Sequence, residues 1–285
     1  MRIDQLLVQR GLANTRSQAQ RLIADGVEWA QGETWRRIVK NGDEVPDGAE
    51  VRLLDDSEAR YVSRGGLKLE AALKTVGLSV EGFACLDVGQ STGGFTDCLL
   101  QHGAKSVVGV DVGSAQLHPN LRSDPRVLCV EKVNARALTA DDLLAAYEDS
   151  TGEDGPFEAD EPDEANEDDA DPADTAGAPE FVPEFDLIVA DLSFISQTLV
   201  LPAVVPLLKP GGTLLTLVKP QFELQPGQVG KGGIVKDPAF YVVVEQRLRD
   251  ACAALGLTVT AWFDSPIEGG DGNREFFICA THVAE

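Results

Sequence analysis

Residues 83–95 have the sequence FACLDVGQSTGGF, an apolar run that leads through a loop of small residues into an apolar helix. Small residues allow a ligand to approach the backbone, and the free N–H groups at a helix N-terminus favour polar or anionic groups. A second apolar run, SVVGVD, follows at 106–111 and ends in Asp111, whose carboxylate could accept both hydroxyls of a ribose. A tight turn without a ligand is the alternative, but strand, loop, helix and downstream acid together favour a nucleotide-like ligand.

The glycine spacing of this loop distinguishes two classes of ligand. A nicotinamide dinucleotide site favours GxGxxG, and here Ser91 stands in place of the second glycine. Asp87, at the end of the first apolar run, is better suited to hold the ammonium group of a methionyl donor. We therefore predict a site for S-adenosyl-L-methionine. Its candidate residues are Asp87, Gly89, Ser91, Thr92, Gly93, Gly94 and Asp111.

Apolar runs of strand and helix type alternate along residues 61–285, which is typical of a parallel sheet with helices on both faces. The expected fold class is therefore α/β, with a Rossmann-like methyltransferase sheet. Strands are expected at 83–88, 106–111, 126–130, 185–191, 212–218, 259–263 and 275–282, and helices at 66–76, 94–102, 197–208 and 239–255. Residues 149–180 are rich in Asp, Glu, Pro, Ala and Gly, so we expect a disordered acidic insert there.

Four charged residues occupy the ends of the expected strands and helices. Asp191 and Lys219 each directly follow an apolar strand, Glu275 begins the last one, and Lys68 lies in the first turn of a helix. Carboxyl ends of parallel strands meet at one edge of a sheet, which is where such folds place their sites. Lys219 should be partly desolvated there and could act as a base near neutral pH. Each has an ordinary alternative: a helix cap or solvated turn for Asp191, a snorkelling lysine at the sheet edge for Lys219, a hairpin start for Glu275 and a solvated helix face for Lys68. Together they form a candidate catalytic set.

The overall charge does not exclude RNA as a partner, and the cysteines favour a reduced, intracellular setting. The net charge is -23, but residues 141–184 hold 18 acidic and no basic residues, so the rest of the chain nets only -5 and RNA remains a possible partner. The five cysteines form no CxxC pair, which predicts reduced thiols and no metal site. We see neither a signal peptide nor an apolar run of the roughly 18–20 residues that span a bilayer, and expect a cytoplasmic protein without membrane contact.

Residues 1–60 have a pattern of their own and are expected to form a small separate domain. Two helical stripes are separated by Gly11, and Thr15 is a plausible N-cap for the second. Residues 1–40 contain seven Lys or Arg and four Asp or Glu, a balance that could pair with phosphates, although a solvated mixed-charge domain is the alternative. The candidate RNA-binding residues are Arg2, Arg16, Arg21 and Arg64.

Five strings give the chain a resemblance to the TlyA family, whose members are known as haemolysins and as rRNA 2′-O-methyltransferases. They are SRGGLKL, DVGQSTGGFT, DLSFIS, LVKPQFE and GGDGNREF. The first 23 residues resemble an S4 RNA-binding domain, and the family is similar to the RrmJ/FtsJ ribose methyltransferases with their Lys-Asp-Lys-Glu tetrad. The resemblance places that tetrad on Lys68, Asp191, Lys219 and Glu275. It covers nearly the whole chain except the acidic insert.

The resemblance implies S-adenosyl-L-methionine-dependent methylation of a ribose 2′-hydroxyl in ribosomal RNA or ribosomal subunits, at a cytidine. The expected domains are an S4-like unit at 1–60 and a methyltransferase unit at 61–285. A lid at 226–233, with Lys231, is expected to close over the RNA. A membrane-active cytolysin and a non-catalytic RNA-binding regulator are the alternatives. The lack of a basic amphipathic helix argues against the first, and the intact set of motifs argues against the second.

Overall fold

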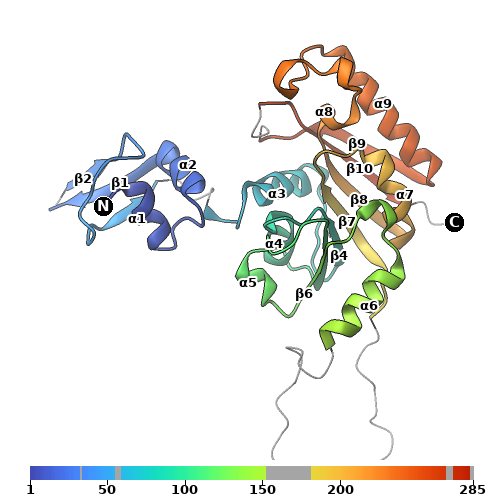
Figure 1. The fold of residues 1–285 in the computed structure, drawn as a ribbon, viewed down its shortest axis with the longest axis horizontal. Coiled ribbons are helices and arrows are strands. Elements are labelled where there is room, and N and C mark those ends of the chain that lie inside the picture. Colours follow the sequence, from blue (N-terminus) through green and yellow to red (C-terminus); the bar gives the residue numbers. More distant parts are fainter. Residues whose placement is uncertain (33, 55–58, 152–180, 268–271, 283–285) are drawn as a thin grey trace, which may run out of the picture.

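The computed structural model describes residues 1–32, 34–54, 59–151, 181–267 and 272–282. They form a small N-terminal unit and a larger unit that meet near the start of helix α3 (Figure 1). The small unit contains α1 (Ile3–Gln9), α2 (Arg16–Gly26), β1 (Val27–Gln31), β2 (Thr34–Arg37) and β3 (Val51–Leu53). Its strands form an antiparallel sheet in the order β2-β1-β3, packed on a core that includes Leu6, Leu7 and Leu22. As expected, Thr15 caps α2, because its Oγ1 accepts the Gln18 N–H at 3.1 Å.

The larger unit is built on a seven-stranded sheet in the order β6-β5-β4-β7-β8-β10-β9. Its strands are β4 (Ala84–Val88), β5 (Ser106–Asp111), β6 (Val127–Glu131), β7 (Phe185–Asp191), β8 (Leu208–Val218), β9 (Leu257–Asp264) and β10 (Phe276–His282). Within this sheet β10 runs antiparallel to both of its neighbours, β8 and β9. The expectation of a parallel sheet is therefore wrong for β10. Since β10 begins where the parallel strands end, its first residues lie at the same edge as Asp111 and Asp191.

Helices cover both faces of the sheet, as expected. They are α3 (Arg64–Val76), α4 (Gly94–Gln101), α5 (Pro119–Arg122), α6 (Ala140–Thr151), α7 (Leu201–Val204), α8 (Pro220–Glu223) and α9 (Ala239–Ala254). Short 3₁₀ turns lie at Ala135–Ala137, Gln197–Leu199, Val205–Leu207, Pro226–Gln228 and Lys231–Gly233. Alternate strand residues enter two cores: Leu86 packs with α7 and α9, and Cys85 packs with α3 and α4.

The helix expected at 197–208 is wrong as one continuous element. A 3₁₀ turn, α7 and a second 3₁₀ turn occupy this stretch, and Pro202 and Pro206 are the second residues of α7 and of the second 3₁₀ turn. Proline lacks the N–H that a helix interior requires, so each one starts a new helical turn instead of extending the previous one.

The acidic stretch leaves and re-joins the large unit at the amino edge of the sheet. Residues 149–151 belong to α6, so the expected disorder is wrong for them, and residues 152–180 lie outside the described part of the chain. The Phe181 ring stacks on Tyr147 of α6 with centroids 4.7 Å apart, and β7 begins four residues later. Asp191 is at the opposite end of β7. Among the described residues, no helix is long and apolar enough to cross a bilayer.

Candidate active site

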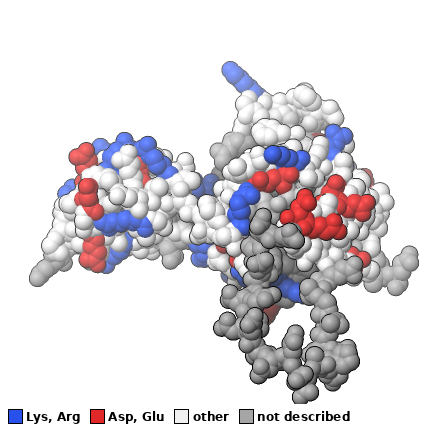
Figure 2. All heavy atoms as spheres, turned by 60° about the horizontal axis from the view of Figure 1, so that its bottom comes forward, with Lys and Arg blue, Asp and Glu red and all other residues white. Residues whose placement is uncertain are grey.

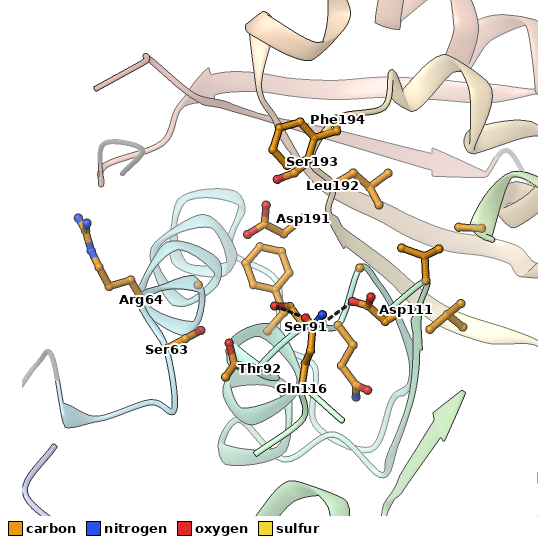
Figure 3. A pocket seen from close by; sticks show the side chains of 18 of the residues that line it. Ser63, Arg64, Ser91, Thr92, Asp111, Gln116, Asp191, Leu192, Ser193 and Phe194 are labelled. Carbon is orange, nitrogen blue, oxygen red and sulfur yellow. Dashed lines mark hydrogen bonds between the residues drawn. The ribbon is translucent and has the colours of Figure 1, made fainter. Parts of the chain in front are cut away.

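A cavity of about 920 Å³ opens at the edge of the sheet where β4, β5, β7 and β8 end (Figure 3). The loops that follow these strands line it, together with the start of α3. Three residues of the small unit, Thr15, Gln18 and Arg21, also reach it. Gln18 is buried and donates to the Tyr61 carbonyl oxygen at 3.4 Å, which joins the two units beside the cavity.

The small residues after β4 are required by close packing against other segments. Gly89 has a φ of +84°, and a Cβ there would lie 2.8 Å from the Asp191 carbonyl oxygen. A Cβ at Gly94 would lie 2.1 Å from the Ser63 Oγ, so this position also excludes any side chain. Gly89, Ser91, Thr92 and Gly94 line the cavity, whereas Gly93 packs against Leu117 and Leu121. The loop therefore holds the ends of β4, β7 and α3 within contact of one another at the cavity.

Asp111 ends β5, lines the cavity, and organises the backbone around it. One carboxylate oxygen accepts the Ser91 N–H at 2.7 Å (Figure 3). The other accepts the Gly113 N–H, also at 2.7 Å. A carboxylate has about four acceptor sites, so two of these remain for a ligand. Asp111 lies at the strand end and in the cavity wall, and its contact with a ligand stays a prediction. Its carboxylate also accepts the N–H of Ser91, which has a left-handed conformation with a φ of 49°.

Asp87 lies beneath the loop and is fully enclosed by protein. Its Oδ2 accepts from the Thr96 Oγ1 at 2.7 Å, and Thr96 in turn accepts from the Gln90 Nε2 at 3.0 Å. The other oxygen, Oδ1, is buried and has no hydrogen-bond partner within the described structure. Burial, the largest cause, raises the pKa of Asp87 to about 7. Asp87 is not among the residues that line the cavity. A buried carboxylate with one unsatisfied oxygen beneath the loop is still suited to a cationic group, because a cation would supply the missing interaction.

Asp191 and Lys219 form a close ion pair that lines the cavity. The Lys219 Nζ lies 2.5 Å from the Asp191 Oδ1 and donates to the Ser193 Oγ at 2.9 Å. Both residues follow neighbouring parallel strands, and β7 and β8 align Asp191 with Leu217. The charged pair therefore arises from the register of two adjacent strand ends.

Lys68 and Glu275 form a second ion pair, which does not line the cavity. The Lys68 Nζ lies 2.5 Å from the Glu275 Oε2, and the side chains are only 10% and 4% exposed. Lys68 comes from the first turns of α3 and Glu275 from the residue before β10, so the antiparallel direction of β10 is what brings Glu275 to this edge. The four residues of the expected set thus form two pairs, one in the cavity wall and one buried.

An exposed aromatic residue at the cavity was missed by the sequence analysis. Phe194 is 91% exposed, has a φ of +64°, and lines the cavity together with Ser193 (Figure 3). Its ring lies 5.0 Å from that of Phe222, which follows Lys219 on α8. A bulky residue in a left-handed conformation is unusual and often marks a functional position. The available signal was an aromatic residue three positions after the strand end at Asp191.

The four arginines expected to bind RNA occupy two kinds of position. Arg2 and Arg16 both bind the buried Asp4, at 2.9 and 3.0 Å. Hydrogen bonding from Arg2, the largest cause, lowers the pKa of Asp4 to about 2 despite its burial. Arg2 and Arg16 therefore have a structural function within the small unit, whereas Arg21 and Arg64 line the cavity from the two units.

The segment expected to act as a lid is anchored at its carboxyl end. The buried Asn273 accepts the Val235 N–H at 3.0 Å and donates to the Gly233 carbonyl oxygen at 2.9 Å. Asn273 lies two residues before Glu275, so this anchor is next to the buried ion pair. Any closing movement of 226–233 would have to begin upstream of it.

Charge is distributed unevenly over the surface. The visible face of the small unit carries both basic and acidic side chains, and a group of acidic side chains lies on the large unit (Figure 2). Within the described residues, no group of three His, Cys, Asp or Glu side chains could hold a metal ion.

Known proteins resemble this chain along nearly its whole length. The FtsJ-like methyltransferase family matches residues 61–282, and the S4 domain family matches residues 1–26. YqxC of Bacillus subtilis is 41% identical over 97% of this chain and 84% of its own length. The Mycobacterium tuberculosis 16S/23S rRNA (cytidine-2′-O)-methyltransferase TlyA is 39% identical over 97% of this chain and 88% of its own length. A solved structure from Streptococcus thermophilus, of a protein with a hemolysin name, is 37% identical, has a TM-score of 0.66, and covers 99% of this chain and 88% of its own.

Proposed function

This chain belongs to the TlyA family of FtsJ-like methyltransferases, and on that premise we propose that it methylates a ribose 2′-hydroxyl of ribosomal RNA, at a cytidine, with S-adenosyl-L-methionine as donor. The observation that carries the proposal is the Asp191–Lys219 pair in the wall of a cavity whose floor is the loop after β4. This combination provides a proton-handling pair beside a nucleotide-like ligand site.

The donor half of the cavity would be formed by residues after β4 and β5. Asp111 has two acceptor sites left for a ribose, and the unsatisfied Oδ1 of Asp87 is suited to the methionyl ammonium group. When bound, the donor supplies a methyl group attached to a positively charged sulfur. These residues fit that molecule because one acid faces the cavity and the other lies buried beneath its loop.

The acceptor half of the cavity would be formed by residues after β7 and β8. A hydroxyl must lose its proton as its oxygen bonds to the methyl carbon and the methyl–sulfur bond breaks, and the Lys219–Asp191 pair is placed to receive that proton. The Lys219 Nζ donates to the Ser193 Oγ and lies 2.5 Å from the Asp191 Oδ1, so these two groups would hold the lysine nitrogen in place beside the substrate oxygen. The buried Lys68–Glu275 pair would hold the N-terminal part of α3 against the residue that precedes β10.

RNA would approach across both units. The small unit carries the S4 pattern, and its Arg21 reaches the cavity that Arg64 lines from the large unit. Arginine side chains provide phosphate contacts, and exposed aromatic rings such as Phe194 can stack on an unpaired base.

The direct test is mass spectrometry of rRNA nucleosides. Ribosomal subunits should gain 2′-O-methylcytidine when incubated with the purified protein and the methyl donor, and cells lacking the protein should lose it. A protein with Lys219→Ala should bind the donor and leave the nucleoside unmodified. Unchanged nucleosides together with lysis of cells by the protein, without RNA or donor, would favour the cytolysin alternative.

A further inference from the structure

A further buried carboxylate, that of Glu223, has no part in the proposed chemistry. It is 3% exposed and lies at the end of α8, four residues after Lys219. Its Oε2 accepts from the Ser196 Oγ at 2.5 Å, and its Oε1 accepts the Gln197 N–H at 2.8 Å. Both partners belong to the segment after β7, so Glu223 connects the two segments that follow the catalytic strands.

Gln197 extends this connection to the strand that leads to Lys219. Its Nε2 donates to the Leu217 carbonyl oxygen at 2.7 Å, and its Oε1 accepts from the Thr216 Oγ1 at 2.7 Å. Gln197 is 2% exposed, so all of these bonds lie in the interior. The backbone that carries Ser193 is therefore attached to β8 by a Gln197 side chain and to α8 by Glu223.

These bonds close a ring that contains the cavity residues. Lys219 donates to Ser193, the chain continues through Phe194 to Ser196, Ser196 donates to Glu223, and α8 returns to Lys219. The Phe194–Phe222 ring contact lies within the same ring. Phe194 keeps a φ of +64° within it, a conformation that a phenylalanine adopts only when its surroundings enforce it.

Burying this carboxylate is unfavourable for folding in itself. Burial raises the pKa of Glu223, although the nearby charge of Arg247 opposes this, and no ion pair to its carboxylate is formed among the residues that the structure describes. Arg247 of α9 donates to its backbone carbonyl oxygen instead. A buried acid without a paired cation usually costs stability compared with an apolar side chain. The bonds that Glu223 makes between the segments after β7 and β8 therefore point to a role in holding these segments in place.

We propose that Glu223 is a positioning residue, whose bonds to Ser196 and Gln197 fix Ser193 and Asp191 against the Lys219 amino group. The inference rests on the proposed function, because it concerns the alignment of the group that handles the proton. A displacement of about 1 Å at such a group can lower the rate of chemistry roughly 100-fold.

The proposal is tested with Glu223→Ala, Glu223→Gln and, as a matched control, Asp186→Ala. Asp186 also accepts a backbone N–H, that of Ala84 at 2.9 Å, but it lies at the amino edge of β7, away from the cavity. Hydrogen exchange in the ligand-free full chain should accelerate about tenfold at the Gln197 amide in Glu223→Ala, because one buried hydrogen bond is lost. Asp186→Ala should leave that amide unchanged.

Single-turnover methyl transfer supplies the second measurement. Glu223→Ala should lower the rate constant by about 10- to 100-fold while the donor Kd stays within about twofold of wild type. Glu223→Gln should recover most of the rate, because its amide oxygen can still accept the Gln197 N–H. Should Glu223→Ala fail to fold, Ser196→Ala removes one bond of the ring and should lower the rate in the same direction.

Two results would overturn the proposal: a wild-type rate in Glu223→Ala, or a rate loss that Asp186→Ala reproduces at equal thermal stability. Absence of methyl transfer by the wild-type protein would instead contradict the proposed function. The exchange measurement at Gln197 would still decide whether Glu223 holds this segment.

Discussion

The Lys68 Nζ lies 2.5 Å from the Glu275 Oε2, although 207 positions of sequence separate the two residues. Both side chains are buried, so each charge depends on the other. Lys68→Met should therefore destabilise the protein by about 3–5 kcal/mol, because Glu275 would remain buried without a partner. The double variant Lys68→Met/Glu275→Leu should recover most of this free energy of unfolding, since two apolar side chains replace the pair.

The same double variant separates stability from chemistry. If the pair serves catalysis, methyl transfer should remain low even though urea denaturation shows a stability near that of wild type. Recovery of both stability and rate would assign Lys68 and Glu275 to folding alone and would remove them from the catalytic set.

Lys219→Ala should abolish methyl transfer and preserve donor binding. Lys219 lines the cavity between Asp191 and Ser193, whereas the donor residues belong to other strand ends. Calorimetry of donor binding and single-turnover transfer to ribosomal subunits measure the two properties separately. A near-normal single-turnover rate in this variant would exclude Lys219 from proton handling.

Asp87 gives the protein a stability that depends on pH. Burial raises the pKa of Asp87 to about 7, above the value of 3.8 that an unburied aspartate has. The folded state therefore binds this proton more tightly than the unfolded state, and stability should fall as pH rises from about 4 to about 7. Asp87→Asn should exceed wild type in thermal stability at pH 8, by on the order of 1–4 kcal/mol, and match it near pH 4.

The same residue predicts how donor binding responds to pH. If the donor ammonium group binds Asp87, it favours the charged carboxylate, so wild-type affinity should weaken as pH falls below about 7. Asp87→Asn should bind weakly at all pH values and lose this dependence. Equal pH profiles of the donor Kd in both proteins would show that the ammonium group binds elsewhere.

Arg21→Ala should weaken RNA binding while leaving donor affinity unchanged. Arg21 reaches the cavity from the small unit, and removal of one phosphate contact should reduce the slope of log K against log salt by about 1. Arg126→Ala is the control, because Arg126 pairs with Asp124 just before β6, at the amino edge of the sheet. Equal effects of the two substitutions would argue against a specific contact at Arg21.

Sequence patterns predicted the sheet better than the helices, for reasons visible in single elements. β5 and β7 have the expected bounds because each is a continuous buried apolar run between turn residues. α6 was missed because Leu143 is its one fully buried residue, so an apolar stripe hardly marks it. The direction of β10 was missed because no residue pattern states whether a strand runs parallel to its neighbours.

Some features of the candidate site could also be predicted from the sequence, and others could not. Asp191 and Lys219 could be placed together because strand ends share an edge, and the structure joins them at 2.5 Å. The buried hydrogen bonds of Asp87 and Glu223 could not be predicted, because they depend on which side chains face one another across separate segments. Exposure of Phe194 was equally hidden, since a phenylalanine in an apolar sequence usually predicts a core position.

The last prediction concerns the acidic stretch 152–180, which holds 13 acidic residues and no basic residue. Its flanking residues meet at the amino edge of the sheet, where Phe181 stacks on Tyr147, and Asp191 is at the other end of β7. Replacing 152–180 by a short Gly-Ser linker that keeps both aromatic residues should leave thermal stability, donor affinity and the methylation rate nearly unchanged. RNA association should become slightly faster at low salt, because the acidic stretch no longer repels the phosphates. At a salt concentration where the Debye length is about 10 Å, long-range repulsion is screened and the rate should equal that of wild type. Stopped-flow association at two salt concentrations measures this difference. A large loss of methylation after the replacement would show that this stretch takes part in the reaction.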